Sequence, residues 1–423
     1  NDAYDPSVTE SGFGGTSQGA YELRLDFRPS ITDSLRDASG VPLDGDGDGA
    51  PGGVFNFWFR AASPAGTADR TNEVQQFDIS GATDGVFRII FDGEVTMPLP
   101  YDATPADVQA AMEALPNIGV GNVSVSGDVL PEGPVSIEFV GDLALTDVAE
   151  ISIGRSGLTG GMTTITTLTQ GSNTAQIVYV DKADTTPDDQ PDVGTLANPY
   201  NVIHSALNLD ADGLPLTGSA MDPNAAGPGD VVRIVANGDS PETSLPYQIG
   251  LSAFDSSPLE DGAKLDIPND VSLVVDPGVV FKMRRSAIVV GSTSVGIDHS
   301  LASLQVLGTP QRRATFTSIN DFTSTNSARG DWGGILFAGD QDQAAERVRY
   351  EELGVFLNYV GNADIRYGGG IVNIGSIPQS IVAVDIRDAR PSIRFNNLTS
   401  NSVAAISATP DSFEETRFST PEF

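Results

Sequence analysis

The stretch from Leu265 to Thr317 constrains the fold of this chain more than any other. Short apolar runs rich in β-branched residues recur along it, and each ends at Pro, Gly, Asn, Asp or Ser, which favour sharp turns. The runs are Val271–Val275, Val279–Phe281, Ala287–Val290, Leu304–Leu307 and Ala314–Phe316. Runs this short, with breakers this close, indicate β-strands and leave no room for a helical period.

Evenly spaced short strands can build a sandwich, a barrel or a solenoid. Small residues at the corners, frequent Asn, Ser and Thr, and similar runs that continue almost to Phe423 favour a solenoid. We therefore expect a mainly β protein in which residues 174–423 form a parallel β-helix.

Several phrases of this region are VSLVVDPGVVFKM, LQVLGTPQRRATFTSINDF, GDWGGILFAG, ADIRYGGGIV and PSIRFNNLTSNSVAAISATP. They resemble the turns of right-handed, pectate-lyase-like parallel β-helix regions in large secreted bacterial surface proteins, notably those of planctomycetes. The succession YVD, ANPYNVIHSAL and PGDVVRIV is similar to the N-terminal start of such β-helices. The resemblance implies a right-handed β-helix at the cell surface. It implies no particular activity, because a fold does not dictate function.

Residues 1–65 are predicted to be a β-sandwich segment. Ala20–Arg28 alternates apolar and charged side chains, the pattern of a half-buried strand, and Val54–Phe59 is a second expected strand. The sequence LDGDGDGAPGG lies between them.

This loop is the first candidate metal site. Asp44, Asp46 and Asp48 alternate with glycines, so three carboxylates can converge on one ion, as Ca²⁺ prefers. Backbone carbonyls, or Asp33 and Asp37, could complete the set of ligands. The loop resembles the DxDxDG calcium loops of other secreted proteins, but it is not an EF-hand because its twelfth position is not acidic. A solvated acidic turn without an ion is the alternative.

Residues 73–172 are predicted to form a small α+β module. Asp92-Gly93 is a hairpin signal, and Thr104, Pro105 and Asp107 make a capping box at the start of a helix. The helix has one apolar face and is followed by strand patterns, which indicates a helix packed on an antiparallel sheet. The phrase FRIIFDGEVTMPLPYDATPADVQAAMEALPNIGVGNVSVSG resembles a module that is repeated in many large bacterial surface proteins, and no functional site is predicted in it.

The β-helix is expected to begin with a capping helix, since an uncovered end would expose apolar side chains and unpaired backbone groups. Asn198 is the predicted N-cap and Pro199 the first helical residue. An acidic loop precedes the helix, and it is a second, weaker calcium candidate because its spacing is irregular. The predicted ligands there are Asp181, Asp184, Asp188 and Asp189, with Asp192 nearby.

Charge and composition exclude several functions. The net charge of −34, from 57 acidic and 23 basic residues, repels nucleic acid and anionic lipid. It attracts divalent cations, although it could also serve solubility alone. The absence of cysteine excludes thiolate chemistry and disulfides, and no apolar run is long enough to span a membrane.

No catalytic residues are assigned. The two histidines, His204 and His299, lack the neighbours of a triad or a zinc site and are expected to be structural. Polysaccharide cleavage, by a lyase or a hydrolase, is the enzymatic alternative, and it would need carboxylates across a groove. The candidates would be Asp331, Asp364, Asp385 and Asp388, with Arg366, Arg387 or Arg390 and a Trp332 platform. These residues also fit ion pairs and core packing.

The sequence therefore predicts a calcium-stabilised extracellular structural or adhesive protein of the cell surface rather than an enzyme. Its expected partner is itself, in a fibre, stalk or surface layer, and an extracellular glycan is a possible second one. Four arginines come in two pairs and are expected to neutralise carboxylates on neighbouring turns, or on a neighbouring copy. They are Arg284, Arg285, Arg312 and Arg313.

Overall fold

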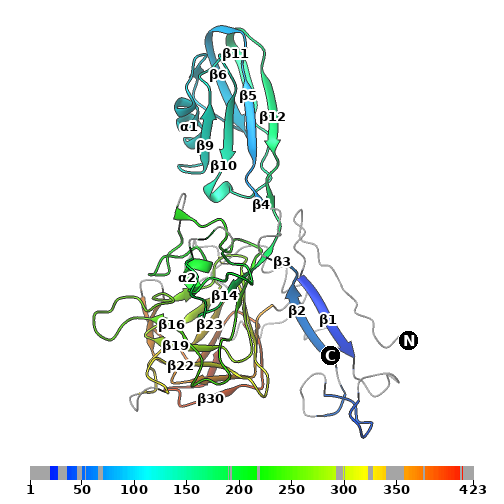
Figure 1. Cartoon of the computed structure of the whole chain (residues 1–423), viewed down its shortest axis with the longest axis vertical. Helices are drawn as coiled ribbons and strands as arrows, with labels where there is room; N and C mark the ends of the chain where they lie inside the picture. Colours follow the sequence, from blue (N-terminus) through cyan, green and yellow to red (C-terminus); the bar gives the residue numbers. More distant parts are fainter. Residues whose placement is uncertain are drawn as a thin grey trace. The chain divides into compact units, whose positions relative to one another are not determined.

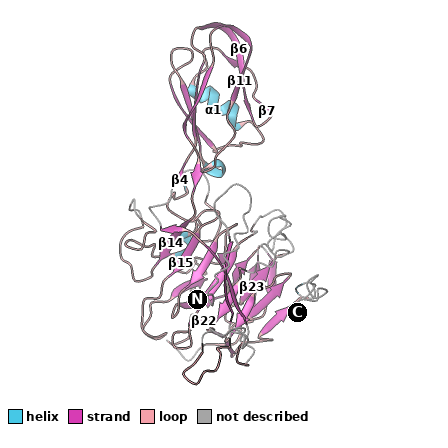
Figure 2. Ribbon diagram, turned by 90° about the vertical axis from the view of Figure 1, so that its right-hand side faces the viewer, coloured by secondary structure: helices cyan, strands magenta, loops and turns pink. Residues whose placement is uncertain are grey.

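The computed structural model describes residues 20–26, 36–44, 50–52, 54–64, 70–188, 190, 193–216, 220–291, 299, 301–322, 327–339, 357–374, 377–409 and 412. Its contacts divide the chain into two compact units. The first comprises Asn1–Thr67, Ala175–Pro215 and Pro223–Phe423, and the second comprises Ala68–Thr174 and Leu216–Asp222. Both are built mainly of β-strands (Figures 1 and 2), which confirms the predicted mainly β class.

The described part of the first unit contains three parallel sheets. The seven-stranded sheet has the order β29 (Ser392–Arg394), β24 (Tyr359–Gly361), β21 (Ser303–Leu307), β18 (Ser272–Val275), β15 (Val231–Ile234), β14 (Gln176–Val180) and β3 (Ser63–Pro64). The second sheet has the order β16 (Tyr247–Gly250), β19 (Val280–Arg284), β22 (Ala314–Ser318), β25 (Ala363–Arg366) and β30 (Asn397–Thr399). The third has the order β17 (Leu265–Asp266), β20 (Ile288–Val290), β23 (Ile335–Ala338), β28 (Val384–Arg387) and β31 (Ile406–Ala408).

The chain visits these sheets in a fixed rotation. From β15 onward, successive strands enter the seven-stranded, the second and the third sheet, and the next strand pairs in parallel with the one a full turn earlier. We call one such passage a turn. The short apolar runs seen in the sequence are the strands of these turns, and the Pro, Gly, Asn and Asp breakers lie between them. Between β25 and β28, β26 (Ile371–Ile374) and β27 (Ile377–Ser380) form an antiparallel hairpin that interrupts this rotation.

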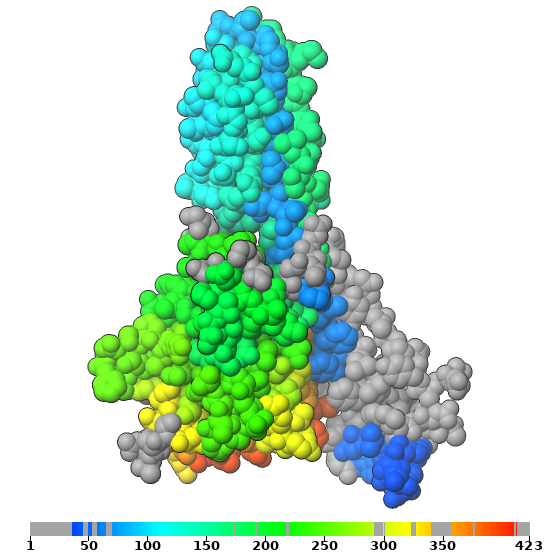
Figure 3. Space-filling model, viewed as in Figure 1, coloured from blue at the N-terminus to red at the C-terminus, as the bar shows by residue number. Residues whose placement is uncertain are grey.

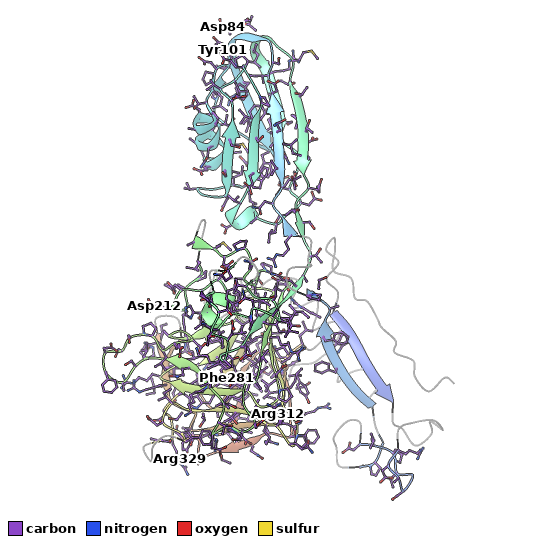
Figure 4. The ribbon with its side chains drawn as sticks, in the orientation of Figure 1. Asp84, Tyr101, Asp212, Phe281, Arg312 and Arg329 are labelled. Carbon is purple, nitrogen blue, oxygen red and sulfur yellow. The ribbon has the colours of Figure 1, made fainter. Side chains whose placement is uncertain are left out.

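Aromatic side chains of the second sheet are aligned from turn to turn in the buried core. Tyr247, Phe281 and Phe316 are in register on successive turns, and all three are buried. Their ring centroids are 5.7 Å and 5.0 Å apart, and the second pair is stacked (Figure 4 marks Phe281). Offset aromatic pairs contribute about 0.5–1.5 kcal/mol beyond burial, so the ladder ties successive turns together.

Several corners after the second sheet have left-handed backbone. Arg285, Tyr367 and Ser400 follow β19, β25 and β30, with φ of 52°, 61° and 56°, and Gly250, the last residue of β16, has φ of 129°. At Gly250 a Cβ atom would lie 1.9 Å from the carbonyl oxygen of Arg284, so only glycine fits at this position.

The N-terminal part of the first unit forms one antiparallel pair, β1 (Ala20–Asp26) with β2 (Val54–Arg60), and then β3 joins the seven-stranded sheet. The predicted β-sandwich in residues 1–65 stays a prediction, because much of this segment lies outside the described residues.

The short helix α2 (Ile203–Ala206) begins later than predicted. Its N-cap position is Val202, so the prediction of Asn198 as cap and Pro199 as first residue is wrong. Tyr200 is the reason: its backbone is extended and bridges to Val180, and its N–H donates to the carbonyl of Tyr179. The helix can start only after this bridge. The apolar side chains of Tyr200, Ile203 and Leu207 are buried.

The second unit has two antiparallel sheets. One has the order β12 (Thr164–Thr169), β5 (Val74–Asp78), β10 (Val135–Phe139) and β9 (Val123–Gly127). The other has the order β11 (Ser152–Gly160), β6 (Ala82–Phe91) and β7 (Glu94–Val95), and β8 (Leu99–Pro100) also pairs with β6. Two short strands, β4 (Arg70–Thr71) and β13 (Ser172–Asn173), pair separately, and η1 (Gly141–Leu143) is a 3₁₀ turn.

Local predictions in this unit are confirmed. The helix α1 (Pro105–Glu113) begins with the predicted capping box, in which Thr104 and Asp107 exchange hydrogen bonds. Val108 and Met112 are buried on its apolar face. Asp92 and Gly93 both have positive φ, 44° and 85°, as the hairpin between β6 and β7 requires.

Candidate functional site: polar links across the parallel sheets

The first calcium candidate can be located only in part. Asp44 is described, and its backbone bridges to Gly52, but Asp46 and Asp48 lie outside the described residues. Of the two further candidates, Asp33 is also outside, and Asp37 accepts hydrogen bonds from the N–H groups of Ser39 and Val41. Calcium at this loop stays a prediction.

In the second calcium candidate, the described carboxylates accept separate hydrogen bonds from different groups. Asp181 accepts from the N–H of Ala183, Asp184 from the Thr186 hydroxyl and Asp188 from the N–H of Asn201. Asp189 lies outside the described residues. Among the residues that are described, no three or more His, Asp or Glu side chains gather in a way that could hold a metal ion. This site also stays a prediction.

Three of the four carboxylates considered for catalysis, Asp331, Asp364 and Asp385, are engaged in structural contacts. Asp364 on β25 pairs with Arg313 at 2.7 Å, and Asp385 on β28 pairs with Arg387 at 3.0 Å. Asp331 accepts hydrogen bonds from the Ser318 hydroxyl and from a backbone N–H. Arg313 precedes β22, the neighbour of β25, so the expectation that these arginines neutralise a neighbouring turn is confirmed for Arg313.

A second cluster covers the outer face of the second sheet. Asp321 accepts a hydrogen bond from Thr317 at 2.7 Å and pairs with Arg366 at 3.0 Å, while its carbonyl accepts from Lys282 at 2.7 Å. The ring of Phe322 lies 5.6 Å from the Lys282 ammonium and 4.8 Å from the Arg366 guanidinium. Burial lowers the pKa of Lys282, and Asp321 opposes this effect. Three successive strands, β19, β22 and β25, are therefore joined by one loop.

Trp332 belongs to the core. It is fully buried, and its Nε1–H donates to the carbonyl of Arg366 at 2.7 Å. A buried indole cannot serve as a platform for a sugar, so the structure favours the packing role over the glycan-binding one.

A buried ion pair lies beside α2 at the first described turns. Lys182 is 3.0 Å from Asp261, with side-chain exposures of 6% and 0%, and 3.3 Å from Glu260. Asp261 also accepts hydrogen bonds from the N–H groups of Ile203 and Gln248. Burial raises the pKa of Asp261, and Lys182 opposes this shift. Sequence reasoning missed this pair; the one available signal was a lysine inside the acidic loop.

Two further titratable side chains line the same region. The Tyr247 hydroxyl lies 2.9 Å from the carbonyl oxygens of Val180 and Val235, and burial raises the pKa of this phenol. His204 on α2 has a lowered pKa, because it is partly buried and faces Lys182, while Asp210 acts in the opposite direction. Its Nδ1 atom is buried without a hydrogen-bond partner. The Lys182–Asp261 pair and the Tyr247 hydroxyl therefore hold the first turns together by polar contacts.

The strand β2 braces the seven-stranded sheet from outside. Arg60 pairs with Asp270 at 2.6 Å and donates to the carbonyls of Asp270 and Leu301. Further along, Gln305 donates to the carbonyl of Trp58, and the Phe57 and Tyr359 rings meet edge to face at 5.5 Å. Three turns are thus held by one strand, which links them mechanically.

Two asparagines, of which Asn401 is buried and Asn396 half-buried, add a third kind of link. Asn396 accepts from the N–H of Ala363 and donates to the carbonyl of Val360, both one turn earlier. Asn401 makes the same pair of bonds with Gly368 and Ile365. Each side chain satisfies backbone groups that the sheets leave unpaired at the corners.

Comparisons with known proteins do not assign this chain to a family. No protein-family model matches the chain. A stretch of 79 residues is 37% identical to a tail sheath protein of Mycobacterium phage Bxz1. The matched stretch makes up 19% of this chain and 12% of the tail sheath protein. A solved structure from Mycobacterium phage Patience aligns with 38% of this chain and 64% of its own, at 19% identity and a TM-score of 0.19. A TM-score this low carries no argument about the fold. No helix among the described residues is long and apolar enough to cross a membrane.

Proposed function

We propose that this chain is a structural protein whose first unit is a right-handed parallel β-helix that acts as a stiff element in an extracellular assembly. One observation carries the proposal: the chain passes through three parallel sheets in rotation, and separate polar links fasten each turn to the next. Quasi-one-dimensional stacks of this kind gain stability from contacts between neighbouring turns.

The contacts between turns favour a mechanical role, because they resist extension along the axis of the stack. In a stack of parallel strands, pulling along the axis must break the backbone hydrogen bonds of a whole turn together with the buried aromatic ladder of Tyr247, Phe281 and Phe316. The cysteine-free chain has no disulfides to supply this resistance. The candidate carboxylates Asp364 and Asp385 hold arginines instead of facing each other across an open site.

We further propose that calcium stabilises the N-terminal segment. Asp44, Asp46 and Asp48 would be brought together in a chain with a net charge of −34, and a divalent cation would remove their mutual repulsion. The resemblance to large secreted bacterial surface proteins supports an extracellular location at the cell surface. Local identity to a protein named as a tail sheath supports a structural role with self-association into a fibre, stalk or layer.

Negative-stain electron microscopy of the full chain tests the proposal. We expect ordered fibres or sheets in millimolar Ca²⁺ that disperse after chelation. The double variant Asp46→Asn and Asp48→Asn should form them poorly even with Ca²⁺. Isolated particles under all conditions would contradict self-assembly, and cleavage of a polysaccharide by the purified chain would contradict the structural role.

A further inference from the structure

One edge of the second unit is an open β-strand without charge. β12 ends its four-stranded sheet and pairs, within the described residues, with β5 alone. Thr164, Thr166 and Leu168 are exposed along it. In Figure 3 the strand is part of the green column at the margin of this unit. Such an edge presents backbone N–H and C=O groups that can pair with another strand.

Native proteins protect open edges with charged residues, proline or bulges. β12 has little of this protection: no Asp, Glu, Lys or Arg occurs between Arg155 and Asp181, in a chain with a net charge of −34. A register shift between Thr167 and Thr169 interrupts the ladder with β5. The regular part, Thr164–Thr167, is therefore the segment available for pairing.

The opposite edge of the same sheet is blocked. β9 lies beside α1, and the N–H of Val125 donates to Oε1 of Gln109 on that helix, at 3.3 Å. A backbone donor of β9 is thus already used by a side chain that lies across the edge. A head-to-tail contact between β12 and β9 of another copy would have to displace Gln109.

We propose that β12 pairs with β12 of a second copy, antiparallel and about a two-fold axis. This inference rests on the proposed self-assembly, in which the β12–β12 pair would be one of the contacts between copies. Two strongly acidic copies can approach most closely where both surfaces are neutral. In antiparallel pairing, side chains on the same face oppose each other, so Thr166 faces Thr166 or Thr164 of the copy, and such Thr–Thr pairs are favourable. The two-fold operation makes the contact self-complementary.

The test uses the full chain and light scattering after size exclusion over a concentration series. We expect the wild type to dimerise and Thr166→Asp to dimerise at least ten-fold more weakly, because two carboxylates come within about 8 Å across the strands. Thr166→Lys should also weaken the dimer, although it reduces the net negative charge. The matched control Ser124→Asp, at an exposed position of β9, should dimerise like the wild type.

The outcomes separate the inference from the proposed function. If the wild type associates and both Thr166 variants associate equally well, the β12 contact is wrong while self-assembly stands. Weakening by Ser124→Asp to the same degree as Thr166→Asp would also overturn it, since bulk charge would then be the cause. A wild type that stays monomeric at all concentrations overturns both. Thermal unfolding of each variant identifies any that fails to fold, and in that case the oppositely charged variant decides.

Discussion

Arg60 and Asp270 are 210 positions apart in the sequence, yet their side chains form an ion pair of 2.6 Å that holds β2 against the seven-stranded sheet. The side chain of Arg60 is almost fully buried, and Asp270 lies at a corner with φ of 55°, two residues before β18. Arg60 therefore fixes β2 beside the starts of two successive turns, at Asp270 before β18 and at Leu301 before β21.

Replacing Arg60 by alanine should destabilise the first unit. The change removes the Arg60 side of the ion pair with Asp270 and the hydrogen bonds to the carbonyls of Asp270 and Leu301, of which the Asp270 carbonyl still accepts from the N–H of Gly229. Removal of one partner of a partly buried pair costs about 2–3 kcal/mol after allowance for the exposure of Asp270. Guanidinium unfolding measures the loss. The control is Arg329→Ala, at the exposed arginine marked in Figure 4, which should change stability by less than about 0.5 kcal/mol. Equal effects of the two changes would contradict the brace.

Gly250→Ala should be more damaging than a glycine change elsewhere. The new Cβ would lie 1.9 Å from the Arg284 carbonyl in addition to requiring φ of 129°. We expect a loss above about 2 kcal/mol. Gly40→Ala is the comparison: its φ is 81° but nothing lies within 4 Å of the added atom, so only the backbone cost of about 1 kcal/mol remains. A smaller loss at Gly250 than at Gly40 would be inconsistent with the close packing of this corner.

Asn401→Ala should weaken the last turns. It deprives the N–H of Gly368 of its acceptor in a buried position, which costs about 1–3 kcal/mol. Asn397→Ala removes an exposed side chain that donates to Asp364, and it should cost less than half as much. Chemical denaturation of both variants gives the comparison, and similar losses would show that Asn401 is not a structural bridge.

Stability should fall as the pH falls through the ordinary pKa range of histidine. Burial lowers the pKa of His204 in the folded state, so between its folded pKa and about 6.5 the unfolded chain binds a proton that the folded chain does not. Protonation of His204 therefore costs no stability above about pH 6.5, and the free energy of unfolding decreases as the pH falls from there toward the folded pKa. In His204→Gln this part of the slope should disappear. Denaturant unfolding at pH 7.5 and pH 6.0 measures it, and an unchanged slope in the variant would exclude His204 as the cause.

Local features of the sequence predict local structure well. The capping box at Thr104, the hairpin at Asp92-Gly93 and the short strands after Leu265 depend on residues close in sequence, and the structure contains all three. The predicted start of α2 is too early, because the bridge between Tyr200 and Val180 joins residues that are not neighbours in sequence. Propensity at Asn198 and Pro199 cannot anticipate a tertiary bridge that keeps the backbone extended.

Composition and turn residues at fixed positions are enough to predict short β-strands at close intervals, a strongly acidic surface and the lack of disulfides. Which strand pairs with which, and therefore which polar groups meet, depends on contacts between residues that are far apart in the chain. Lys182 with Asp261 and Arg366 with Asp321 come together because parallel stacking places residues from different turns side by side, and Arg60 meets Asp270 because β2 packs against the stacked turns. The register of that stacking depends on the whole apolar ladder, and no single stretch of sequence specifies it.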